Sequence, residues 1–88
     1  MMQRRVLLMG MPGCVPCRNR KKQLEQLQAE LGYEVEYIED VTRREDLVSM
    51  YDIQSVPVIV AGNAQPLVGG GQIDKLRQYL TAALSTTD

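Results

Sequence analysis

Residues 4–31 read RRVLLMGMPGCVPCRNRKKQLEQLQAEL, a short apolar run followed by two cysteines and a long amphipathic stretch. The apolar run at residues 4–9 ends in a segment rich in Gly and Pro, which predicts a buried strand and a turn. From Arg18 to Leu31 there is neither Gly nor Pro, and leucines recur at helical spacing, at Leu24, Leu27 and Leu31. Gly32 follows, where a left-handed helix cap is favoured. This stretch therefore predicts a strand, a cysteine-bearing turn and a helix of about four turns.

The rest of the sequence predicts three further strands and two further helices. A second strand is predicted at residues 34–39, where the residues alternate. Thr42 and Glu45 have the spacing of a capping box and open a short helix. The most β-prone run, VPVIVA at residues 56–61, predicts a third strand, and residues 67–68 a brief fourth one. A closing amphipathic helix is marked by apolar positions at Ile73, Leu76, Leu80, Ala83 and Leu84.

Together these elements predict the order β-α-β-α-β-β-α. Two strand–helix–strand units followed by a hairpin and a helix predict an α/β fold, a four-stranded mixed sheet with helices on both faces. The first three strands can be parallel only through right-handed crossovers. A chain of 88 residues has no length for a second core, so we expect residues 1–88 to form a single domain.

The composition excludes several classes of function. The net charge is -1 with both signs interspersed, so the basic field that nucleic acid or an acidic membrane surface requires is absent. The chain has no His, which excludes histidine-based catalysis and His metal ligands. The apolar run at residues 6–9 is too short for a signal peptide, and no stretch approaches the roughly 20 apolar residues of a transmembrane helix. We therefore expect a cytoplasmic protein, where two close cysteines indicate catalysis or metal binding.

Cys14 and Cys17 lie where the predicted turn meets the predicted helix. The free N–H groups and the dipole at a helix N-terminus favour an anion, so we expect Cys14 to be the exposed, attacking thiolate, with a pKa below the roughly 8.5 of a free thiol. Cys17 falls on the leucine stripe, so we expect it to be buried and to resolve the mixed disulfide. The basic cluster at residues 18–22 should also favour the thiolate, although such a run is most often a solvated helix face.

Two other interpretations of the cysteine pair remain open at this point. The two cysteines could be buried and inert. They could also bind a metal, but two thiolates supply only half of a tetrahedral zinc site, and the chain has no His or third Cys. A two-coordinate soft-metal site is the stronger alternative, that of a copper carrier. Gly10 and Met11 precede the pair much as in small copper-carrying domains, but one extra residue intervenes and this chain ends in a predicted helix rather than a strand.

Three motifs resemble the thioredoxin/glutaredoxin superfamily, in the same order and over nearly the whole chain. They are the strand–CxxC–helix unit, Ser55-Val56-Pro57 before the third strand, and Gly70-Gly71-Gln72-Ile73-Asp74 before the last helix. The resemblance implies the thioredoxin fold. It also implies a thiol–disulfide oxidoreductase in which Cys14 attacks and Cys17 resolves, an electron donor of cell redox homeostasis with no bound cofactor and no metal.

The same resemblance implies which residues contact the substrate. Pro57 would follow a cis peptide bond and face the cysteines, and Val56 would offer its backbone to an extended substrate chain. Val15 and Pro16 would flank the attacking sulfur. Further substrate contacts would come from Gly70 and Gly71, through close backbone approach, and from Asp74, which matches the residue that binds the amino group of glutathione. An Asp is equally well placed in the first turn of any helix.

The branch within the superfamily decides the expected partners. Pro16 directly precedes the second Cys, as in thioredoxin, whereas glutaredoxins commonly carry Pro after the first. Met11 stands where glutaredoxins often have a glutathione-binding Lys, yet the Trp that precedes the thioredoxin motif is absent as well. The chain thus resembles the short glutaredoxin-like proteins that behave as thioredoxins. We expect a monomer that acts on protein disulfides and is recycled by glutathione or by a flavin-dependent thioredoxin reductase.

Overall fold

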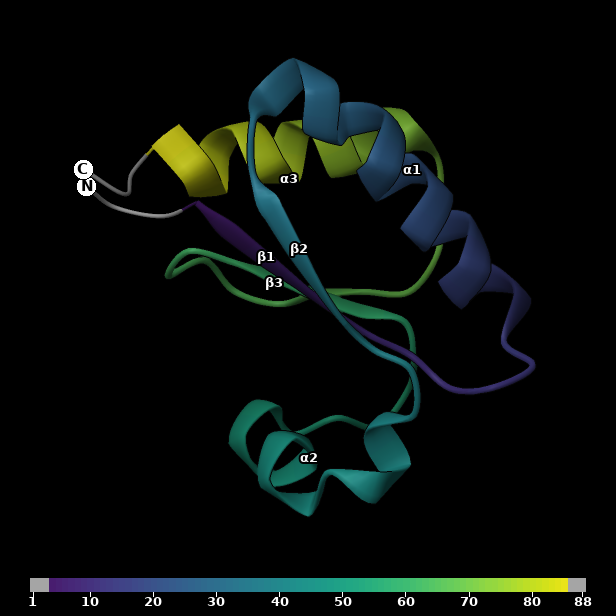
Figure 1. Ribbon diagram of the computed structural model, residues 1–88. Coiled ribbons are helices and arrows are strands. Elements are labelled where there is room, and N and C mark those ends of the chain that lie inside the picture. Colours follow the sequence, from purple (N-terminus) through teal and green to yellow (C-terminus); the bar gives the residue numbers. More distant parts are fainter. Residues whose placement is uncertain (1–3, 86–88) are drawn as a thin grey trace.

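The elements follow the predicted order, as Figure 1 shows. The computed structural model describes residues 4–85. Its elements are β1 (Arg5–Met9), α1 (Val15–Leu31), β2 (Glu34–Ile38), the 3-10 turn η1 (Val41–Arg43), α2 (Glu45–Tyr51), β3 (Val58–Ala61), β4 (Leu67–Val68) and α3 (Ile73–Ser85). In this part of the chain no helix is both long and apolar enough to cross a bilayer.

The four strands form one mixed sheet in the order β2-β1-β3-β4. β1 is parallel to β2 but antiparallel to β3, so the possibility that the first three strands are all parallel is wrong. The register shows where the chain returns to the sheet. Met9 at the end of β1 pairs with Ile38 at the end of β2 and with Val58 at the start of β3. Since the seven residues of α2 span only about 10 Å, the connection does not carry the chain back along the sheet. The chain therefore re-enters the sheet at the edge where it left.

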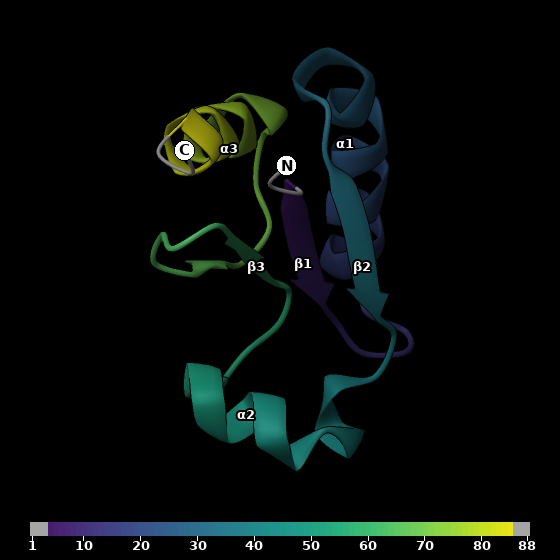
Figure 2. The ribbon, with the colours of Figure 1, turned by 60° about the vertical axis from the view of Figure 1, so that its left-hand side comes forward.

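Helices cover both faces of the sheet, as predicted (Figures 1 and 2). Because side chains alternate along a strand, Val6 and Leu8 point to one face and Leu7 and Met9 to the other. The first face packs on α1 and α3 and forms the larger core, which includes Leu24, Leu27, Leu76 and Leu80. The second face packs on α2 through a smaller buried cluster of Met9, Val41, Leu47 and Val58. The cysteine-bearing helix thus rests on the larger core.

The ends of α1 agree with the sequence prediction. Cys14 is the N-cap residue, and Pro16 lies in the first turn, where its missing N–H costs nothing. Gly32 ends the helix with a left-handed φ of 69°, and its N–H donates to the carbonyl oxygen of Gln28. The helix therefore begins one residue after the cysteine that was expected to attack.

The predicted capping box is wrong. Thr42 lies inside η1, whose N-cap is Asp40: the carboxylate of Asp40 accepts hydrogen bonds from the backbone N–H and the hydroxyl of Thr42. α2 starts only at Glu45, after Arg44, with no side chain capping its first turn. The Thr42 hydroxyl is engaged by Asp40, which caps η1 because Asp is at least as good an N-cap residue as Thr, so Thr42 does not cap α2.

Candidate active site

Cys14 and Cys17 form a disulfide at the N-terminus of α1. Their Cα atoms are 5.2 Å apart, within the usual range for a disulfide. The Sγ of Cys14 also accepts the backbone N–H of Cys17 at 3.1 Å, so a free helix-terminal donor points at this sulfur. Cys14 is partly exposed and Cys17 is fully buried. One sulfur is therefore open to a partner and lies beside a hydrogen-bond donor, while the other is shielded.

Gly10 lets β1 pass close to the buried cysteine. A Cβ atom at position 10 would lie 3.1 Å from both Cβ and Sγ of Cys17, tighter than ordinary contact, and 3.6 Å from the hydroxyl of Tyr37. The N–H of Gly10 donates to the carbonyl oxygen of Ile38 in β2 at 3.0 Å. Cys17 is thus packed directly against the end of the central strand.

Pro57 lies at the same edge of the sheet, and the Val56–Pro57 peptide bond is cis, as the family resemblance implied. Met9 pairs with Val58, so Gly10, which follows Met9, and Pro57, which precedes Val58, lie at the same edge of the sheet. Gly10 is also the residue that lies against Cys17. Pro57 is buried, and its carbonyl oxygen accepts the N–H of Gly69 at 2.8 Å.

The glycine-rich loop before α3 packs on the cysteine turn. A Cβ at Gly70 would lie 3.1 Å from the Cβ of Pro16, so a larger residue at position 70 would push the loop away from α1. Gly71 lies beside Arg20, with 3.3 Å between its Cβ position and one guanidinium nitrogen. Gly70 and Gly71 therefore belong to the same region as the two cysteines.

Arg20 corrects the interpretation of residues 18–22 as a solvated helix face. It is only 2% exposed, and its side chain donates to the carbonyl oxygens of Gly69 and Gln72. Burial lowers the pKa of its guanidinium from the ordinary value. Arg18, Lys21 and Lys22 are exposed, as predicted, and the ammonium of Lys21 lies 4.8 Å from the centre of the Tyr37 ring.

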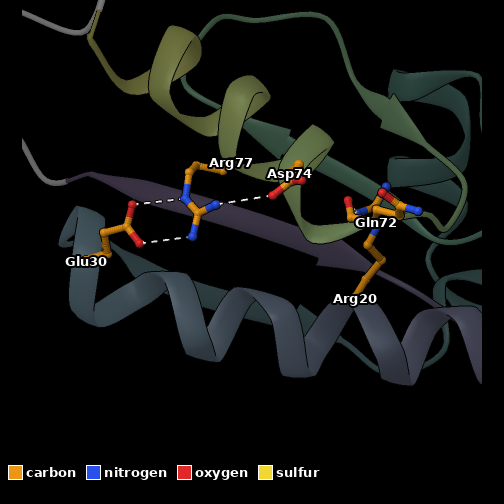
Figure 3. Close-up of polar contacts among 5 residues, drawn as sticks. All are labelled: Arg20, Glu30, Gln72, Asp74 and Arg77. Carbon is orange, nitrogen blue, oxygen red and sulfur yellow. Dashed lines mark hydrogen bonds and ion pairs between the residues drawn. The ribbon is translucent and has the colours of Figure 1, made fainter.

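Asp74 faces a different set of partners from the other predicted site residues. Its side chain is 75% exposed in the first turn of α3, and its carboxylate contacts the guanidinium of Arg77 at 3.4 Å. Arg77 also makes two hydrogen bonds to Glu30 on α1, at 3.0 and 3.2 Å (Figure 3). A ligand ammonium at Asp74 would therefore compete with Arg77 for the carboxylate.

Exposed apolar side chains precede and follow Cys14 along the chain, and sequence reasoning found only part of the apolar surface to which they belong. Val15, directly after Cys14, is 53% exposed, and Met11, three residues before it, is 40% exposed. Met11 and Val56 also line a groove of 440 Å³, which reaches to Val48 and Ile53 around α2. The sequence gives no signal for this groove, because its lining comes from four segments that only the fold brings together.

Solved structures place this architecture in the thioredoxin fold. The chain is similar to a malarial protein (TM-score 0.74, 17% identity, covering 94% of this chain and 99% of the other). It is also similar to a reduced thioredoxin pre-protein of Schistosoma mansoni (TM-score 0.73, 20% identity, 92% and 79%). A thioredoxin-like protein of Clostridium perfringens gives a TM-score of 0.76 at 18% identity, over 97% and 74% of the two chains. At these identities the likeness establishes the fold.

The family is established by a match in sequence. The profile of the glutaredoxin-like domain (DUF836) matches residues 5–81, so the chain belongs to this glutaredoxin-like family. A comparison with curated proteins gives no match. The family, the fold and the Cys14–Cys17 disulfide together support a redox role.

Proposed function

We propose that this protein is a thiol–disulfide oxidoreductase that reduces disulfides in other proteins by a dithiol mechanism. The observation that carries the proposal is the asymmetry of the cysteine pair. Cys14 is accessible at the helix cap, with the Cys17 N–H donating to its sulfur, and Cys17 is completely buried one turn further on. A donor directed at Cys14 stabilises its thiolate, which is the attacking species in disulfide exchange.

The reaction proceeds in two exchanges. In the reduced protein the Cys14 thiolate attacks one sulfur of the substrate disulfide, forms a mixed disulfide and releases the other substrate sulfur as a thiolate. The Cys17 thiolate then attacks the Cys14 sulfur, which forms the Cys14–Cys17 disulfide and releases the second substrate thiolate. Two electrons pass from the cysteine pair to the substrate, whose two thiolates take up the two protons given up by the pair.

The surroundings of Cys14 suit an extended polypeptide as substrate. Val15 and Pro16 are exposed beside the sulfur, and Val56 precedes the cis peptide bond at the same edge. We propose that the backbone of Val56 pairs with the substrate chain in the manner of an added strand. Gly70 would form the opposite wall, where the absence of a side chain permits close approach of a second backbone.

The oxidised pair must be reduced again, and we propose glutathione or a flavin-dependent thioredoxin reductase as the reductant. Both belong to a reducing compartment, and we propose the cytoplasm on that ground. The Arg77 contact at Asp74 bears on the choice, because the ammonium of glutathione would have to displace it. The measurement is direct: reduce the oxidised protein separately with glutathione and with the reductase, and compare the rates.

The activity itself is tested with a disulfide-bonded protein substrate and a dithiol reductant. We expect catalytic reduction by the wild-type protein and none by Cys14→Ser. Metal analysis of protein purified under reducing conditions tests the alternative function, a soft-metal carrier. Tight, stoichiometric Cu(I) together with no reductase activity would contradict the proposal and favour a soft-metal carrier.

A further inference from the structure

Arg20 is the one charged side chain that the structure buries among residues 4–85. Its Nε donates to the Gly69 carbonyl oxygen at 3.1 Å, and its Nη1 donates to the Gln72 carbonyl oxygen at 3.5 Å. Nη1 also donates to the Oε1 of Gln23 at 2.9 Å, and the Nε2 of Gln23 donates to the Gly71 carbonyl oxygen at 2.9 Å. Two side chains of α1 thus hold three carbonyl groups of one four-residue loop. In the described part of the chain, none of the ion pairs includes Arg20.

The Arg20 guanidinium is buried and bonds only to neutral oxygens, so no opposite charge offsets the free energy of removing it from water. Burying a charge costs free energy unless hydrogen bonds replace its hydration. Leu24 and Leu27 occupy the same buried face of α1 at no such cost. The hydrogen bonds of Arg20 also fix the positions of the loop carbonyl groups, because the planar guanidinium holds its N–H donors in a fixed geometry. An apolar side chain would not do this. Figure 3 shows the Arg20 side chain directed from α1 toward Gln72.

The loop held in this way, residues 69–72, contacts both the cysteine turn and the residue that follows the cis peptide bond. Gly70 packs on Pro16, which lies between the two cysteines in the sequence. The Gly69 N–H donates to the carbonyl oxygen of Pro57, the residue after the cis peptide bond. Arg20 follows Cys17 by three residues, so it lies on the same helix face one turn further on. The position of this loop relative to the Cys14 sulfur therefore depends on a contact made from the cysteine-bearing helix itself.

We propose that Arg20, assisted by Gln23, is a positioning residue for docking of the protein substrate: it holds residues 69–72 against Pro16 as a fixed wall of the site. This inference rests on the proposed function. A small disulfide reaches the partly exposed Cys14 without this wall, whereas an extended polypeptide lies between the wall and Val56. Loss of the clamp should therefore affect the two kinds of substrate differently.

The test compares Arg20→Met with wild type on a disulfide-bonded protein and on hydroxyethyl disulfide, both with a dithiol reductant. We expect kcat/KM for the protein to fall by about tenfold to a hundredfold, since a displacement of about 1 Å is enough for such a loss. The rate with hydroxyethyl disulfide should not change. Arg20→Lys should restore part of the loss, because an ammonium still donates to carbonyl oxygens. Amide hydrogen exchange at residues 69–72 should be faster in Arg20→Met.

Arg77→Met is the matched control, because Arg77 also joins α1 to the C-terminal segment but its side chain is 42% exposed and bonds to Glu30. It should alter neither rate. Equal losses with both disulfides in Arg20→Met would mean damage to the cysteine turn and overturn the inference, as would unchanged rates with both. If Arg20→Met does not fold, Gln23→Met decides by the same comparison, with a smaller selective loss expected. Wild-type protein that fails to reduce any protein disulfide would instead overturn the proposed function.

Discussion

The two ends of α1 are joined to the C-terminal segment in different ways. Near the cysteines, Arg20 is buried and donates to neutral carbonyl oxygens of the loop before α3. Three turns further on, Glu30 meets Arg77 of α3 in an ion pair whose two side chains are 50% and 42% exposed. The hydrogen bonds to Glu30 raise the pKa of Arg77. Each contact involves an arginine, but only Arg20 is buried away from water.

This difference separates a contact that fixes geometry from one that is solvent-screened. Exposed ion pairs are weakened by salt and by the freedom of their side chains. A buried, hydrogen-bonded guanidinium admits few alternative arrangements, because breaking any of its bonds leaves a polar group unpaired in the interior. The end of α1 next to the two cysteines is thus the more rigidly held one.

The largest effect is expected at the cysteines themselves. Replacing either one by serine should abolish multiple-turnover reduction of a protein disulfide, since each electron pair requires both sulfurs. The unfolding free energy of the reduced variants should remain close to that of the reduced wild type for the partly exposed Cys14 and fall more for the buried Cys17. Turnover retained by either variant would show that the pair does not act as a unit.

Gly10→Ala tests the packing at the cysteine end of α1. The added methyl would lie 3.1 Å from the Cβ and Sγ of Cys17, closer than an ordinary van der Waals contact. We expect the free energy of unfolding to fall by about 1–3 kcal/mol, the usual cost of overpacking a buried site. Chemical denaturation measures this. A variant as stable as wild type would show that the cysteine end is looser than the contacts indicate.

Tyr33, which follows the C-terminal end of α1, tests a contact away from the cysteines, because its buried hydroxyl donates to the Leu24 carbonyl oxygen in the middle of the helix. Burial, with the nearby charge of Glu30, raises the pKa of Tyr33 to about 12. Because the folded pKa lies above the ordinary value of about 10, stability from this group is complete below about pH 10 and is lost as the pH rises to about 12. Burial raises the pKa of Tyr79 as well. Tyrosinate absorbance should therefore show late titration, of which the contribution near pH 12 disappears in Tyr33→Phe. That variant should be about 1 kcal/mol less stable at neutral pH.

The smallest effect is expected at the exposed ion pair. Glu30→Gln removes the charge that meets Arg77 and leaves the rest of α1 unchanged. We expect little change in the melting temperature at low salt, none at high salt, and unchanged reductase activity with a dithiol reductant. A loss of activity comparable to that of Arg20→Met would remove the distinction between the two ends of the helix.

Sequence reasoning predicted the element order, the sheet composition and the cysteine geometry, because each depends on local patterns. The leucine stripe that ends at Cys17 predicted its burial, and the resemblance at Ser55-Val56-Pro57 implied the cis bond. The direction of β3 could not be predicted from such patterns. It depends on how far the chain travels around α2, which is a property of the whole connection.

The contacts of Arg20 could not be predicted from the sequence either. A charged residue among other basic residues is indistinguishable from a solvated one until the partner is known, and the partners here are backbone carbonyl groups about 50 positions further along the chain. Every residue has a carbonyl group, so no residue type signals such a contact. The Asp40 cap was missed for a related reason, since Asp40, Thr42 and Glu45 offered competing local hydrogen bonds.

The proposed mechanism depends above all on Cys14 being the attacking sulfur and Cys17 the resolving one. The most direct measurement incubates the reduced Cys14→Ser and Cys17→Ser variants with a disulfide-bonded protein and identifies any mixed disulfide by mass spectrometry. We predict a stable mixed disulfide through Cys14 in Cys17→Ser, because the resolving thiol is missing, and none in Cys14→Ser, because Cys17 is buried. A mixed disulfide through Cys17 in Cys14→Ser, with none in Cys17→Ser, would contradict the account.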